Sequence, residues 1–125
     1  MSCHNALMLW ENKQKQPRLF APDVLPNILK MEDILSDWVI PTASILFRSD
    51  IIKILPDWSD RVINGDFFLQ LWCAHHGDIH YSDELMSVYR KDLHGGNFTA
   101  TVLYENKFRF EKFFELLDMF NKETE

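Results

Sequence analysis

The sequence lacks the features that mark several large classes of protein. Its two cysteines, Cys3 and Cys73, do not make a disulfide framework. It has 13 Lys and Arg against 19 Asp and Glu, a net charge of −6, so it lacks the basic excess that binds nucleic-acid phosphates. No run of about 18 apolar residues suggests a transmembrane helix. Residues 1–5 have no basic region followed by an apolar one, as a signal peptide would. These absences predict a cytoplasmic protein with no nucleic-acid partner.

Aromatic side chains, in contrast, are abundant. They make up 14% of the 125 residues and include ten Phe and four Trp. A chain of this length forms one modest domain, and so many rings can bury much of its surface. They can equally form a surface that docks against a partner. The composition leaves both interpretations open.

Several short segments have the pattern of strands. The apolar run Ala6–Trp10 predicts a buried strand, and the polar residues 11–18 after it predict a solvated turn. Ile79–Ser82 and Leu85–Tyr89 are two further strand candidates, joined by residues 83–84. Trp38–Arg48 is expected to be extended, with Pro41 making its first part irregular.

Helices are expected between and after these strands. Met31–Asp37 and Ser49–Leu55 predict short ones. The clearest helix is Gly65–His76, with Asn64 as the N-cap and Gly77 as the stop. Apolar residues surround that helix almost completely, which is typical of a buried helix.

The C-terminal part predicts a long amphipathic helix over Thr101–Lys122. Its apolar stripe consists of Leu103, Phe110, Phe113, Phe114, Leu117 and Phe120. Short strands interleaved with helices indicate the α/β class. Strands with so little local pairing suggest that residues 1–125 form a single partial domain, a piece of a larger sheet.

Three segments together resemble family 2 glycosyltransferases of the GT-A type. They are Pro41-Thr42-Ala43-Ser44-Ile45-Leu46-Phe47-Arg48, then Asn64-Gly65-Asp66-Phe67-Phe68-Leu69 running on to Gly77, then Glu84-Leu85-Met86-Ser87-Val88-Tyr89-Arg90 followed by Gly95-Gly96. The family has the same order: a strand ending near SxxFR, a helix opening with GD or ED, a Gly-centred turn, a strand, and YR before a loop. The resemblance covers nearly the whole chain and implies the C-terminal, acceptor-side portion of the GT-A fold.

The resemblance also implies what this chain does not contain. The family's N-terminal half is a Rossmann-like region that holds the nucleotide and ends in an Asp-x-Asp motif for a divalent metal. No Asp-x-Asp occurs here. In the complete enzyme, the implied partners are a nucleotide-sugar donor, a sugar or glycolipid acceptor, and Mg²⁺ or Mn²⁺. The isolated chain is expected to bind no metal and to associate with the missing half or with itself.

Asp66 falls on the family's general-base position. Inverting sugar transfer needs a base that removes the proton of the attacking acceptor hydroxyl. A carboxylate that opens a buried helix is held rigidly, and the helix N-terminus favours its charged form. The pattern alone has a simpler interpretation, because acidic residues are common in the first turn of a helix. The resemblance is what assigns Asp66 the catalytic role.

Arg90 and His94 lie on or near the loop that, in the family, closes over the donor diphosphate. Arg can pair with phosphate, and His can bond to phosphate or ligate a metal. The alternative for Arg90 is an ion pair with Asp83 or Glu84. The family often has a His two residues after Tyr-Arg, where this chain has Asp92. His94 is the nearest substitute.

A second group, His75, His76, Asp78 and His80, has the residue types of a metal site. Two of these histidines end a helix, where the dipole favours them, and the turn that follows has no defined ligand geometry. We therefore favour the structural interpretation. The whole chain also has a second functional interpretation, as a non-catalytic binding or docking module that uses an exposed aromatic surface.

The first prediction concerns the isolated chain. Without the half that holds the donor phosphates and the metal, the leaving diphosphate is not stabilised, so no turnover is expected. The measurement is nucleotide release from nucleotide sugars with added Mg²⁺ or Mn²⁺ and purified 125-residue protein. Metal-dependent sugar transfer by this protein would contradict the prediction.

Overall fold

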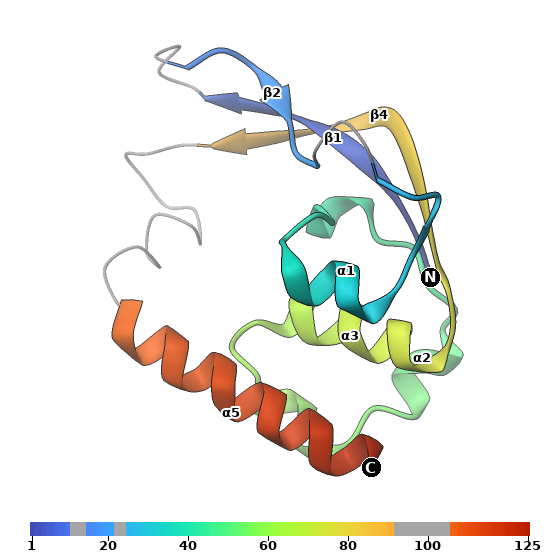
Figure 1. The fold of residues 1–125 in the computed structure, drawn as a ribbon, viewed down its shortest axis with the longest axis vertical. Coiled ribbons are helices and arrows are strands. Elements are labelled where there is room, and N and C mark those ends of the chain that lie inside the picture. Colours follow the sequence, from blue (N-terminus) through green and yellow to red (C-terminus); the bar gives the residue numbers. More distant parts are fainter. Residues whose placement is uncertain (11–14, 22–24, 92–105) are drawn as a thin grey trace.

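In a computed structural model of the chain, the structure describes residues 1–10, 15–21, 25–91 and 106–125. The described part is an α/β arrangement in which helices pack against a mixed four-stranded sheet (Figure 1). The strand order is β2-β1-β4-β3. The predicted α/β class is therefore confirmed.

The sheet is built on two long parallel strands, β1 (Ser2–Trp10) and β4 (Ile79–Lys91). The short strands β2 (Arg18–Leu19) and β3 (Ile28–Leu29) pair antiparallel to β1 and β4 respectively. Parallel neighbours cannot be joined by a tight hairpin, so the chain between β1 and β4 must cross over. Of the helices in the described residues, all but α5 (Asn106–Thr124) lie in that crossover.

The crossover begins with α1 (Met31–Ser36), as predicted, and continues through two 3₁₀ turns, Thr42–Ser44 and Asp57–Arg61, with α2 (Asp50–Lys53) between them. The prediction of an extended segment over Trp38–Arg48 is wrong, because this part of the chain contains a 3₁₀ turn. Pro41 precedes a 3₁₀ turn that the Ser44 hydroxyl closes by donating to the Pro41 carbonyl at 2.7 Å. Only Leu46 joins the sheet, through a bridge to Ser2.

Helix α3 (Gly65–His76) has the predicted bounds and is buried as expected. Figure 1 shows α1 on one side of it and α5 (Asn106–Thr124) on the other. The buried side chains of α3 are Phe67, Phe68, Gln70, Leu71, Trp72 and Cys73. Trp72 also contacts Phe120 of α5, with ring centroids 6.3 Å apart. The core therefore lies around α3, between the sheet and α5.

The C-terminal helix α5 buries part of the predicted stripe. Phe120 is buried and Phe113 and Leu117 pack against the core, as predicted. Phe110 and Phe114 are instead each 65% exposed, and Leu116, which was not in the predicted stripe, is buried. Successive residues turn by about 100°, so Phe114 lies well to the side of Phe113, which packs on the core. Leu103 and the expected helix start at Thr101 lie outside the described residues. No helix in the described part of the chain has the length and apolarity to cross a bilayer.

The two strand candidates of residues 79–89 form one strand, β4, with an irregularity where a linker was expected. Ser82 pairs with His4, Leu85 with Asn5 and Ser87 with Ala6, so β4 inserts extra residues opposite Asn5. Such a bulge disrupts the regular ladder and leaves backbone groups without strand partners. The two halves nevertheless follow the same neighbour, β1.

The side chain of Asn5, at the bulge, accepts hydrogen bonds from two buried backbone N–H groups. Asn5 is 2% exposed, and its Oδ1 accepts from the N–H of Ala6 at 2.9 Å and from the N–H of Ala21 at 3.1 Å. The second bond also holds the segment after β2 against β1. Asn5 therefore satisfies two buried donors with one oxygen.

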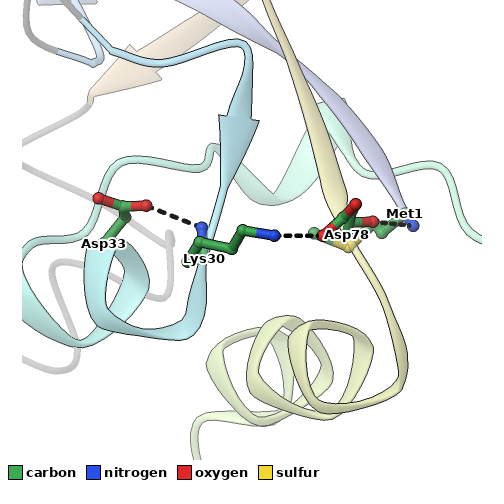
Figure 2. A network of polar contacts seen from close by, with 4 residues as sticks. All are labelled: Met1, Lys30, Asp33 and Asp78. Carbon is green, nitrogen blue, oxygen red and sulfur yellow. Dashed lines mark hydrogen bonds and ion pairs between the residues drawn. The ribbon is translucent and has the colours of Figure 1, made fainter.

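A polar network on the surface joins the start of α1 to the start of β4 (Figure 2). The Lys30 ammonium pairs with the Asp78 carboxylate, while the Lys30 N–H donates to Asp33 Oδ2 at 2.7 Å. The Met1 amino group donates to the Asp78 carbonyl at 3.2 Å. The Asp78 hydrogen bond raises the pKa of Lys30. The pair is exposed, so it orients these ends more than it stabilises them.

The prediction from the sheet concerns Asn5→Ala, which leaves the N–H groups of Ala6 and Ala21 buried without their acceptor. We expect the free energy of unfolding to fall by about 1–3 kcal/mol. Urea denaturation measures it, with Asn121→Ala as the control, because Asn121 is exposed on α5. The control should change stability by less than about 0.5 kcal/mol. Equal unfolding midpoints for the two variants would contradict the role of Asn5.

Candidate functional site

The start of α3 holds the side chain that the sequence singled out. Asp66 lies in the first turn of α3 and is partly exposed. Thr42 Oγ1 donates to Asp66 Oδ2 at 2.6 Å, and the N–H of Phe67 donates to Asp66 Oδ1 at 2.8 Å. Each carboxylate oxygen thus has its own donor. The positive end of the helix dipole adds a favourable field for the negative charge.

Thr42 was not singled out from the sequence. It belongs to the 3₁₀ turn after Pro41, and its hydroxyl reaches α3 from a position 24 residues earlier in the chain. The segment Pro41–Arg48 and the segment that opens α3 are two of the three on which the family resemblance rests. The hydrogen bond between Thr42 and Asp66 brings these two segments together.

Asn64 occupies the N-cap position, but its side chain makes no capping bond, contrary to expectation. Its backbone carbonyl accepts from the N–H of Phe68 at 3.0 Å, which begins the helical ladder. Asn64 Oδ1 is buried and accepts no hydrogen bond from any residue that the structure describes.

A cavity of about 280 Å³ opens beside the start of α3, between α1 and α5. Its walls are mostly apolar, and three of its rings lie in a row. The centroids of Trp38 and Phe67 are 6.3 Å apart, and those of Phe67 and Phe113 are 5.2 Å apart. The full lining is Ile34, Leu35, Asp37, Trp38, Asn64, Phe67, Phe110 and Phe113.

Polar groups are few in this cavity. They come from Asp37, whose Oδ1 accepts from the N–H of Trp38 at 2.7 Å, and from Asn64. Asp66 stands in sequence between Asn64 and Phe67, two of the lining residues, but does not itself form part of the wall. An apolar pocket with a few fixed acceptors is the usual form of a small-molecule site. The carboxylate lies on the same helical turn as this pocket.

The other predicted site residues are not brought to the start of α3. Arg90 lies near the end of β4, exposed, in register with Leu9 of β1. It therefore belongs to the sheet. His94 lies outside the described residues.

The histidines around the end of α3 take part in structural contacts. His76 Nδ1 lies 2.9 Å from the carbonyl oxygen of Trp72, and the two rings are 4.5 Å apart. Asp78 is engaged by Lys30. Within the described ranges, no three His, Cys, Asp or Glu side chains are grouped so that they could hold a metal ion.

Comparisons of this chain with family models, curated proteins and solved structures found no match. The arrangement around Asp66 and the sequence segments that form it are therefore the basis for assigning a function.

The prediction from this site concerns the two bonds of Asp66. Asp66→Asn keeps both, because the Asn oxygen can accept from Phe67 and the Thr42 hydroxyl can accept from the Asn amide. We expect the free energy of unfolding to change by less than about 1 kcal/mol for Asp66→Asn and to fall by about 1–2 kcal/mol for Asp66→Ala.

Urea denaturation of both variants checks this ranking. The matched control is Asp50→Ala in the first turn of α2, where the exposed carboxylate pairs with the exposed Lys53 at 2.9 Å. An exposed pair contributes little, so the control should remain close to the unsubstituted protein. If Asp66→Asn cost as much as Asp66→Ala, the proposed hydrogen-bond geometry would be wrong.

Proposed function

We propose that this chain is the acceptor-side, C-terminal part of a family 2 glycosyltransferase of the GT-A type, with Asp66 as its general base. The observation that carries the proposal is the hydrogen bond from Thr42 to Asp66 at 2.6 Å. It joins two of the three resembling segments at a partly exposed carboxylate. The aromatic cavity beside it has room for part of a substrate.

In this proposal Asp66 acts on the acceptor. Its carboxylate takes the proton of an acceptor hydroxyl while that oxygen attacks the anomeric carbon of the donor sugar. The new bond joins the acceptor oxygen to the anomeric carbon. The bond from that carbon to the nucleotide diphosphate breaks, the diphosphate leaves with the electron pair, and the configuration inverts. Two fixed donors hold the base in one orientation, so little reorganisation is needed before it acts.

The cavity suits the acceptor sugar. One face of a pyranose ring is largely C–H and can lie on the rings of Trp38 and Phe67, while a hydroxyl can donate to the Asp37 carboxylate. A sugar bound there would be held next to the turn that carries Asp66.

The donor and the metal belong to the other half of the proposed enzyme. The sequence has no Asp-x-Asp, and the described residues contain no group of three or more His, Cys, Asp or Glu side chains placed to hold a metal ion. Arg90, with His94, remains our candidate for contact with the donor diphosphate in the complete cytoplasmic enzyme.

One observation favours a second function. Phe110 and Phe114 are exposed on one side of α5, as a docking surface would be. A non-catalytic module would use them to bind another protein and would have no use for the charge of Asp66. The two functions therefore differ in what Asp66 does.

The test begins with the gene. We expect an Asp-x-Asp segment in the same reading frame or in an adjacent subunit, and the assembled product should transfer sugar. In that product, Asp66→Asn should lower turnover by about 10²- to 10⁴-fold, the usual contribution of a positioned base. Nucleotide release and acceptor glycosylation are the measurements.

Asp50→Asn is the matched control, since it changes the same residue type in the first turn of another helix. It should melt and turn over as the unsubstituted enzyme does. An Asp66→Asn enzyme that melts normally and transfers at an undiminished rate removes Asp66 from the mechanism. A gene product with no nucleotide-binding half, whose partner binding depends on Phe110 and Phe114, would establish the docking function instead.

A further inference from the structure

A group of cations surrounds one indole at the end of β1. Arg18 Cζ lies 5.4 Å from the ring centroid of Trp10, Lys15 Nζ lies 5.7 Å from it, and Lys91 Nζ lies 6.0 Å from it. These four residues, here called the Trp10 cluster, come from the end of β1, the segment after it, β2 and the end of β4. Trp10 itself is 8% exposed.

The charges of the Trp10 cluster have the same sign in a chain with a net charge of −6. None of the ion pairs among the described residues includes Lys15, Arg18 or Lys91. Burial, and then Arg18 and Lys15, lower the pKa of Lys91. The charged groups that act on Lys91 are thus themselves cations, and like charges brought together disfavour one another.

A purely structural role does not account for three cations. A cation over an indole gains roughly 0.5–1 kcal/mol at an exposed site. Each of the three cations in the Trp10 cluster also repels the other two, and this repulsion offsets part of the gain. An anion that enters among them would relieve that repulsion and form charge-assisted hydrogen bonds.

The position in the sheet also favours a ligand. Trp10 and Lys91 are the last paired residues of parallel strands β1 and β4, so both lie at the carboxyl edge of this pair. In open α/β sheets, ligands bind at that edge. Side chains alternate along a strand, so Lys91 and Tyr89 share one face of β4 while Arg90 points to the other. Arg90 is accordingly not part of the cluster.

We propose that the Trp10 cluster binds a phosphoryl group. The Arg18 guanidinium can donate two parallel hydrogen bonds to two phosphate oxygens, and the ammonium groups of Lys15 and Lys91 can neutralise the remaining charge. The rings of Trp10 and Tyr89 help to position the cations, since Lys91 Nζ also lies 6.0 Å from the centroid of the Tyr89 ring. The phosphoryl group belongs to a soluble phosphate ester or diphosphate, or to the headgroup of an anionic lipid. The site does not depend on the proposed transferase function.

The experiment titrates the full chain with inorganic pyrophosphate by calorimetry and, in a second arm, mixes it with phosphatidylcholine vesicles with and without phosphatidylglycerol. We expect saturable, salt-sensitive binding in one arm. In that arm Arg18→Gln and Lys15→Gln should each weaken binding by about tenfold or more, because each removes a charged hydrogen-bond donor. Both side chains are exposed, so neither change should unfold the protein.

Arg61→Gln is the control, because Arg61 is an exposed arginine in another part of the fold, 3.8 Å from Asp60. It should leave binding unchanged. Binding to pyrophosphate that the cluster variants weaken supports a soluble phosphate ligand. Binding only to the anionic vesicles, weakened by the same variants, supports the lipid headgroup. No saturable binding in either arm, or equal binding by all variants, would overturn the site.

Discussion

The parallel pairing of β1 with β4 is the constraint on which the rest of the fold depends. It joins residues 2–10 to residues 80–91, and because the two strands are parallel, the chain between them must include a crossover. That crossover places α3 in the core, with its first turn next to the 3₁₀ turn of Thr42. The same pairing brings Lys91 to Trp10 at the opposite end of the strands. Both proposed sites are therefore consequences of a single strand contact.

The pairing is also where the chain tolerates an irregularity. The bulge opposite Asn5 allows β4 to carry more residues than β1 while both remain in one sheet. At the same residue, the Asn5 amide oxygen accepts from the buried N–H groups of Ala6 and Ala21. The buried polar side chain of Asn5 is thus fixed by its hydrogen bonds to the backbone. Asp66 differs from Asn5 in being partly exposed, so that its carboxylate can also meet a substrate.

The sequence predicted best those elements whose bounds are set by neighbouring residues. The bounds of α3 follow from a mainly apolar segment that lies between Asn64 and Gly77, whose φ of 159° is extended backbone. The interruption expected at residues 83–84 is instead a bulge, because pairing with β1 outweighs the polar character of those residues. Phe110 and Phe114 were assigned to the buried stripe because of their residue type, but the orientation of α5 on α3 selects Leu116.

The candidate site shows the same division. Asp66 was identified from a motif. The structure adds Thr42, which the crossover brings into hydrogen-bond contact with Asp66, and Trp38, which packs on the neighbouring Phe67. No local signal pointed to Thr42 beyond its place in the segment Pro41–Arg48. The cations of the Trp10 cluster were likewise not predicted from the sequence. Arg18 and Lys91 are far apart in the chain and come together at Trp10 because β2 and β4 both pair with β1.

A double-mutant cycle between Thr42 and Asp66 tests the central claim most directly. It is measured as sugar-transfer turnover of the complete enzyme with Thr42→Val, Asp66→Asn and both changes. If Thr42 acts by positioning the base, Thr42→Val lowers turnover in the unsubstituted enzyme and has no further effect once Asp66 is Asn. If the two losses simply multiply, the Thr42–Asp66 hydrogen bond does not serve catalysis, and the account of this site is wrong.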